Sequence, residues 1–255
     1  GYVAREEWLA ARRPDSEALR RRLAQQMWAT PPPPPPDATI EISSSAATSI
    51  QRGVVPAGGE RVYVGVDVAA RRLHWTALCP VGDRAHVLSY GIIHAPEAST
   101  DAARIYAALR RLHAVVGGGW IREGDGASIP TRMVCVDSGY EPRAVREACR
   151  AMGWTPCTGR PATMYRGPRW SPGRPHPRAG DGWHVVQAQG IIHDADASKR
   201  ALHEISRAGR LTLFGQAEEH ESFLRHLSAE VARERGGRVV YEKLGSRENH
   251  WLDAT

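Results

Sequence analysis

The chain has 255 residues, 42% of them hydrophobic, and a formal net charge of +6. This length can hold one large domain or two small ones, and the apolar fraction is sufficient for a packed core. Its four cysteines lack metal-binding spacing, and no apolar run is long enough to cross a membrane. These features argue against a disulfide-rich secreted protein and against a membrane protein, so we expect a soluble intracellular protein with reduced thiols.

The positive charge comes almost entirely from arginine, because Lys199 and Lys243 are the only lysines. A guanidinium group binds phosphate oxygens bidentately, which suits a nucleic-acid partner. A GC-rich genome would also favour arginine codons. The composition by itself therefore gives only slight support to nucleic-acid binding.

The first 59 residues differ in composition from the rest. Residues 6–28 have a helical pattern, which the six prolines of residues 31–36 end, and residues 38–59 are rich in Ser, Ala and Gly. We therefore expect a helical segment over residues 1–30, a linker over residues 31–59 and a compact domain over residues 60–255. The helical pattern opens without a start signal, which suggests that the sequence is a piece of a longer chain.

Within the compact domain, strands and helices are expected to alternate after an initial group of strands. The expected strands cover residues 61–69, 72–79, 84–94, 132–136, 154–158, 183–193, 210–214 and 238–242. The expected helices cover residues 99–115, 141–152, 196–207 and 217–235, with a glycine-rich loop over 117–126 and a longer irregular segment over 159–182. Three antiparallel strands followed by a helix, a strand, a helix and a strand is the order of a ribonuclease-H-like fold. The predicted class is thus α/β, a mixed sheet with flanking helices.

Two of the expected strands carry an aspartate at or near their end. Asp67 lies in the apolar run of residues 62–68, and Asp137 follows the apolar residues 133–136. An unpaired carboxylate in such a strand is costly unless a partner or a metal ion compensates it. In the predicted order the two strands are adjacent and parallel at the sheet centre, so both carboxylates could hold Mg²⁺ or Mn²⁺ ions, as in two-metal phosphodiester hydrolysis. A single such Asp is more often a helix cap or a turn residue.

Such a site needs a further carboxylate, and two candidates remain open. Glu230 falls inside the expected helix over residues 217–235, where a solvent-facing structural role is expected. Asp253 lies in the segment Asn249-His250-Trp251-Leu252-Asp253 and could close the site from a final helix.

Basic side chains in and after the irregular segment are candidate DNA contacts. Arginine contacts to phosphate give sequence-independent affinity, although a basic loop without this role is an equal alternative. Lys199 follows Asp196, the expected N-cap of its helix, and could face a phosphate or simply be solvated. Ser138 is expected to cap the helix near Glu141, and Gly139 to let the backbone pass close to the metal site. The candidate DNA contacts are Arg160, Arg166, Arg169 and Lys199.

Five short blocks occur in an order that is typical of one family. They are Val64-Gly65-Val66-Asp67-Val68, Val136-Asp137-Ser138-Gly139-Tyr140, Ala197-Ser198-Lys199, Phe223-Leu224-Arg225-His226-Leu227-Ser228-Ala229-Glu230 and Asn249 with Leu252-Asp253. With these blocks, residues 61–255 resemble the nuclease domain of the large terminase subunit of lambda-like tailed bacteriophages. The N-terminal helix and linker resemble the stretch that joins the packaging ATPase of that family to its nuclease.

The resemblance implies a ribonuclease-H-like, metal-dependent endonuclease that cuts concatemeric viral DNA during genome packaging. It implies that Asp67, Asp137 and Asp253 bind the metal ions. It also implies double-stranded DNA, a small terminase subunit and a portal protein as partners, no membrane, and the cytoplasm of the infected bacterium as location. No GxxxxGK[ST] motif occurs, so the ATP-driven motor is not expected in this chain.

The sequence departs from the family pattern at three places. His250 stands where the family typically has an acidic residue, and Thr158-Gly159-Arg160 replaces a Lys-Gly pair, so Arg160 could supply the positive charge. The family also continues as a helix beyond Asp253, so weak metal binding is expected if this residue frays. Two other functions stay open: a transposase- or resolvase-type nuclease of the same fold, or a catalytically silent module that binds DNA or docks on the portal.

Overall fold

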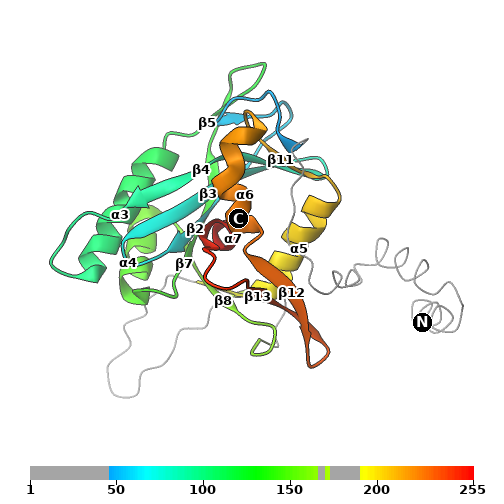
Figure 1. Ribbon diagram of the computed structural model, residues 1–255. Coiled ribbons are helices and arrows are strands. Elements are labelled where there is room, and N and C mark those ends of the chain that lie inside the picture. The colour runs from blue at the N-terminus through cyan, green and yellow to red at the C-terminus, as the bar shows by residue number, and fades with distance from the viewer. Residues whose placement is uncertain (1–45, 166–169, 173–189) are drawn as a thin grey trace, which may run out of the picture. The chain divides into compact units, whose positions relative to one another are not determined.

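The central feature of the computed structural model is a mixed eight-stranded sheet (Figure 1). Residues 46–165, 170–172 and 190–255 are described, so the expected helical segment over residues 1–30 lies outside the described residues. The strands run across the sheet in the order β11 (Leu211–Leu213), β4 (Arg84–His94), β3 (Arg72–Val81), β2 (Val62–Val68), β7 (Thr131–Asp137), β8 (Thr155–Arg160), β10 (Ile191–Asp194) and β9 (Trp170–Pro172).

The strand directions confirm the predicted ribonuclease-H-like arrangement. Strands β2, β3 and β4 form an antiparallel meander, and β7 pairs in parallel with the other side of β2. Strands β8 and β10 continue the parallel half of the sheet. The two strands that carry Asp67 and Asp137 are therefore central neighbours, as the sequence predicts.

Helices α3 (Asp101–Val116) and α4 (Pro142–Met152) lie side by side and cover one face of the sheet (Figure 1). Thr100 caps α3 by accepting a hydrogen bond from the Ala103 backbone N–H. Alternate residues of β2 point into the core below these helices, because side chains alternate between the faces of a strand. The buried β2 residues of this core are Val62, Val64, Val66 and Val68.

The other face carries a second core, below α6 (Glu221–Leu227) and α7 (His250–Ala254). Phe223 and Leu227 of α6 and Trp251 and Leu252 of α7 are buried there against the outer strands β4 and β11. Helix α5 (Ala195–Arg207) packs on β8, β10 and the later strand β13 (Arg238–Lys243). The short helix α7 lies against β2 and β3, at the centre of the sheet.

The helix predicted over residues 217–235 is wrong in its second half. A 3-10 turn, η2 (Ala217–His220), leads into α6, and the chain then forms an antiparallel ribbon of β12 (Glu230–Arg235) and β13 (Arg238–Lys243) (Figure 1). Gly236 and Gly237 join these strands with φ angles of 57° and 73°. Both values lie in the left-handed region that a two-residue hairpin of type I′ requires, and glycine adopts them without a steric cost.

A small three-stranded sheet lies at the edge of the domain. It consists of β1 (Val54–Val55), β5 (Trp120–Arg122) and β6 (Ser128–Ile129), where the sequence suggested linker and glycine-rich loop. Val55 is completely buried in the main core. The described part of the expected linker thus contacts the domain, whereas the domain boundaries themselves stay a prediction. None of the helices in the described ranges is long and apolar enough to span a membrane.

Candidate metal centre

Asp67 and Asp137 lie at the ends of the two central parallel strands. Val66 of β2 pairs with Val136 of β7, so the next residue along each strand is one of these aspartates. Burial, followed by the negative charges of Asp67 and Asp253, raises the pKa of Asp137 to about 6, although two backbone hydrogen bonds act in the opposite direction. Three carboxylates from β2, β7 and α7 therefore gather within electrostatic reach of one another.

Gly139 permits a tight turn around the Asp137 carboxylate. Its backbone N–H donates to Asp137 Oδ1 at 3.2 Å, and a Cβ at this position would lie 3.1 Å from Oδ2. Such a contact is closer than a methyl group normally approaches a carboxylate oxygen. The glycine thus keeps one side of the carboxylate open.

A second glycine allows α7 to lie on the sheet. Gly65 of β2 faces the last turn of α7, where an added Cβ would lie 2.0 Å from the carbonyl oxygen of Ala254. Only a residue without a side chain permits this approach. The close packing brings His250 and Asp253 of α7 to the end of the central strand β2, where Asp67 lies.

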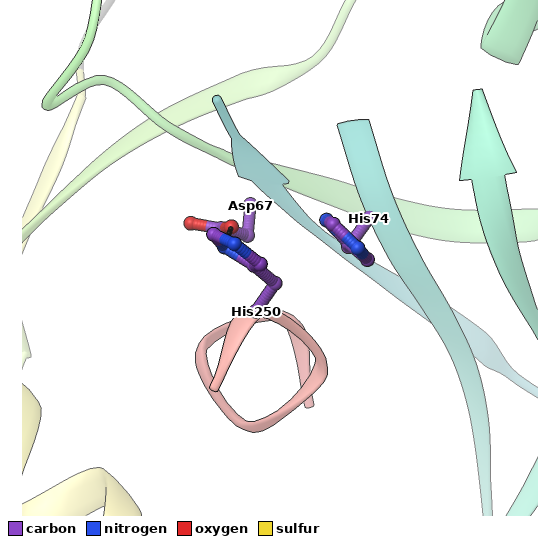
Figure 2. Close-up of side chains that lie close together, drawn as sticks. All are labelled: Asp67, His74 and His250. Atoms are coloured by element: carbon purple, nitrogen blue, oxygen red, sulfur yellow. Dashed lines mark hydrogen bonds and ion pairs between the residues drawn. The ribbon is translucent and has the colours of Figure 1, made fainter. Parts of the chain in front are cut away.

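His250 contacts Asp67 directly, and a second histidine lies beside it (Figure 2). His250 Nδ1 is 2.7 Å from Asp67 Oδ2. The ring of His74, which pairs with Asp67 across the β2–β3 hairpin, stacks on His250 with a centroid distance of 4.4 Å. One carboxylate oxygen and one nitrogen from each ring all lie within 4.8 Å of one another.

The environment of His74 fits a cation-binding role. Its side chain is 0% exposed, and neither ring nitrogen has a hydrogen-bond partner among the described residues. Burial, followed by the neighbouring imidazole of His250, lowers the pKa of His74 to about 3. A neutral imidazole keeps a free lone pair on one ring nitrogen. A buried nitrogen without a protein hydrogen-bond partner is usually satisfied by a water molecule or an ion. The donor set of carboxylates and imidazoles is one that divalent transition-metal ions accept.

Asp253, the predicted third ligand, is held by a buried polar network. Lys199 Nζ lies 2.9 Å from Asp253 Oδ1 and 2.8 Å from each oxygen of Glu230. Asn249 Nδ2 donates to Glu230 Oε1 at 2.6 Å and to Asp253 Oδ2 at 2.7 Å. Burial opposes the charge of Lys199, but Asp253 and Glu230 outweigh this effect, and the pKa of Lys199 is raised.

This network corrects two sequence-based expectations. Glu230 does not face solvent from a helix: it begins β12 and is 3% exposed. Lys199 is not a solvated surface residue, because its side chain is mostly buried between two carboxylates. Neither position could be assigned from sequence, since the contacts join α5, β12 and α7.

Two expected helix caps are also wrong. Ser138 does not cap α4; its hydroxyl donates to the carbonyl of Cys157 at 2.8 Å and thereby ties β7 to β8. Asp194 rather than Asp196 caps α5, by accepting from the Ala197 N–H. Asp196 is buried and accepts from the backbone N–H groups of Ala162 and Tyr241, each at 2.7 Å.

The predicted DNA contacts are only partly described. Arg160 is exposed at the end of β8. Arg166 and Arg169 lie outside the described residues. Lys199 is engaged by carboxylates, as given above.

Sequence reasoning missed His74 and did not assign His250 a role beyond a departure from the family. A signal for His74 was present, because a hairpin centred on Ala70 and Arg71 places residue 74 opposite residue 67. His250 could not be placed without knowing how α7 docks on β2.

No match was found among curated proteins. Similar solved structures include the large terminase nuclease from the thermophilic phage G20c, at 10% identity and a TM-score of 0.44 over 85% of this chain and 95% of that one. The large terminase of the thermophilic bacteriophage D6E matches at 12% identity and a TM-score of 0.46, over 86% of this chain and 43% of that one. RuvC of Thermus thermophilus matches at 16% identity and a TM-score of 0.27, over 38% of this chain and 60% of that one.

The chain spans less than half the length of the D6E large terminase. At the sequence level, the family described as terminase large subunit gpA, endonuclease domain, matches residues 6–255. This match covers nearly the whole chain. The chain belongs to the family of terminase large subunit gpA endonuclease domains.

Proposed function

We propose that this endonuclease domain hydrolyses the phosphodiester bonds of concatemeric double-stranded DNA with two divalent metal ions, Mg²⁺ or Mn²⁺. The observation that carries the proposal is the convergence of Asp67, Asp137 and Asp253 from three separate elements. Carboxylates whose charges raise the pKa of a neighbour repel one another, and a bound cation relieves this repulsion. Family membership makes DNA the expected substrate.

In this proposal Asp67, Asp137 and Asp253 are the metal ligands and catalytic residues. Bound ions would polarise the scissile phosphate, lower the pKa of a water molecule and stabilise the leaving oxygen. Asp67 is central because it neighbours both Asp137 and His250. The imidazoles of His250 and His74 would add nitrogen donors on the α7 side, and nitrogen donors favour Mn²⁺ over Mg²⁺.

The remaining parts of the proposal concern DNA and partner proteins. Arg160, Arg166 and Arg169 would bind backbone phosphates, which gives affinity without sequence preference. The domain over residues 60–255 would act after the helical segment and linker of a larger packaging protein, with a small terminase subunit and a portal protein as partners. The site of action would be the cytoplasm of the infected bacterium.

The test is cleavage of supercoiled plasmid by the purified chain with Mn²⁺ or Mg²⁺. We expect nicked and linear products with the wild type, and loss of both products with Asp67→Ala and with Asp137→Ala. Asp83→Ala is the matched control, because Asp83 is an exposed aspartate of the β3–β4 turn.

Two results would contradict this function. Cleavage that persists in EDTA, or in both metal-ligand variants, would exclude these carboxylates as the active site. DNA binding without cleavage by any variant would favour the catalytically silent DNA-binding or portal-docking module.

A further inference from the structure

The polar network around Asp253 is closed. Lys199 contacts one oxygen of the Asp253 carboxylate, and Asn249 contacts the other. Both Lys199 and Asn249 also contact Glu230, so four side chains from α5, β12 and the start of α7 form a ring. The Asp253 carboxylate is thus fixed in rotation as well as in position.

The burial of the members separates their roles. Glu230 and Asn249 are each 3% exposed, whereas the Asp253 side chain retains 34% exposure. Both carboxylate oxygens of Glu230 accept a hydrogen bond from Lys199, and Oε1 also accepts one from Asn249. It therefore serves as the buried counter-charge of Lys199, while Asp253 is the member that can still be reached from outside the ring.

The ring is also compatible with metal binding. A carboxylate oxygen has about two lone pairs, so one hydrogen bond to each Asp253 oxygen leaves each with a further acceptor position. Groups that hold a ligating carboxylate by hydrogen bonds orient it and tune its affinity. Asp253 is better placed than Glu230 to complete the proposed metal centre, because Glu230 is 3% exposed and its Oε1 already accepts two hydrogen bonds.

We infer that Lys199, with Glu230 as its counter-charge, and Asn249 are positioning residues that hold the Asp253 carboxylate in the orientation required for ion binding. This inference rests on the proposed metal-dependent function. It predicts an unusual direction for the change in metal affinity, because removing the positive charge of Lys199 beside a cation site would weaken cation binding. A purely electrostatic role of Lys199 would do the opposite, because Lys199 repels a cation.

The experiment measures Mn²⁺ affinity of the full chain by titration calorimetry, for the wild type and Lys199→Met. Positioning predicts a loss of affinity on the order of 10–100-fold. Lys199→Met leaves Glu230 buried without a counter-charge and could prevent folding. The double variant Lys199→Met/Glu230→Gln removes both charges and keeps an acceptor for Asn249, and it is expected to show the same direction of change.

Lys243→Met is the matched control, because Lys243 is the other lysine of the chain and is exposed at the end of β13. It should leave Mn²⁺ affinity unchanged. Plasmid cleavage adds a second readout: the Lys199 variants should lower kcat and leave KM for DNA within about twofold, since Lys199 is not placed as a DNA contact.

The outcomes separate this inference from the proposed function. Wild-type binding of Mn²⁺ with equal or tighter binding by the folded double variant would overturn the positioning role and leave the metal centre intact. A wild type that binds no Mn²⁺ would overturn the proposed metal centre and this inference together. Weaker binding by both Lys199 variants, with Lys243→Met unchanged, would support it.

Discussion

Asp67 occupies a position that is set by three neighbours at once. It follows Val66 in the central strand β2, pairs with His74 across the hairpin and contacts His250 of α7. Adjacent residues of β2 point to opposite faces, so Val66 and Val68 anchor the core while Asp67 faces the site. The candidate metal centre is therefore built on a central strand rather than on a loop.

Gly65 offers a direct test of how α7 reaches the site. We expect Gly65→Ala to destabilise the protein by about 1–3 kcal/mol, because the new methyl group would force α7 away from β2. Cleavage should fall more steeply than stability, since α7 carries both His250 and Asp253. Urea unfolding and plasmid cleavage measure the two effects.

Gly118→Ala is the control for this substitution, because nothing lies within 4 Å of the added methyl group. It should change neither stability nor cleavage appreciably. A Gly65→Ala variant with wild-type cleavage would show that the close approach of α7 is not required.

Some site residues can be predicted from the sequence because their signal is local, whereas others depend on contacts between distant segments. Asp67 and Asp137 stand out because a carboxylate at the end of a buried strand is costly without compensation. His74 follows from hairpin register, which is local. The contacts of Lys199 with Glu230 and Asp253 join segments that are 31 or more positions apart, and no local pattern specifies them.

At the level of elements, two aspartates at the start of α5 have different roles. Asp194→Ala removes a helix cap and should cost about 1 kcal/mol. Asp196→Ala leaves the buried backbone N–H of Ala162 and the partly buried N–H of Tyr241 without their charged acceptor, and should cost roughly 3–5 kcal/mol. Urea unfolding of both variants checks the difference. An equal cost would show that Asp196 is not the link between α5, β13 and the segment after β8.

Elements with a continuous apolar run or a clear cap were predictable, including the strand over residues 238–242 that forms β13, whereas its partner β12 was predicted as helix. Residues 229–235 are rich in Ala, Glu and Arg, which favour helices, so local propensity continued the helix of residues 221–227. Burial of Glu230 and Val231 overrides this propensity. The pair Gly236-Gly237 was the available signal, since two glycines between apolar segments are typical of a tight hairpin.

For the whole molecule, the proposed metal centre would link segments that are far apart in the chain. Mn²⁺ at about 100 times its dissociation constant should stabilise the folded state by about 2.7 kcal/mol. For a chain of this size that corresponds to a rise in Tm of about 5–10 °C. EDTA should reverse the rise, and Asp67→Asn should lack it.

The Asp67 variant provides a second check in the absence of metal. Asp67→Asn removes one of the charges that raise the pKa of Asp137, so its metal-free form should melt no lower than the metal-free wild type. A rise of Tm with Mn²⁺ in Asp67→Asn equal to that of the wild type would place the ion elsewhere.

The position of α7 in the chain sets the order in which the parts of the candidate site are synthesised on the ribosome. Strands β2 and β7, with Asp67 and Asp137, are synthesised more than a hundred residues before His250 and Asp253. The strands that carry Asp67 and Asp137 are thus available for pairing before α7 exists. The candidate metal centre is completed only when α7 docks on strands that precede it in the chain.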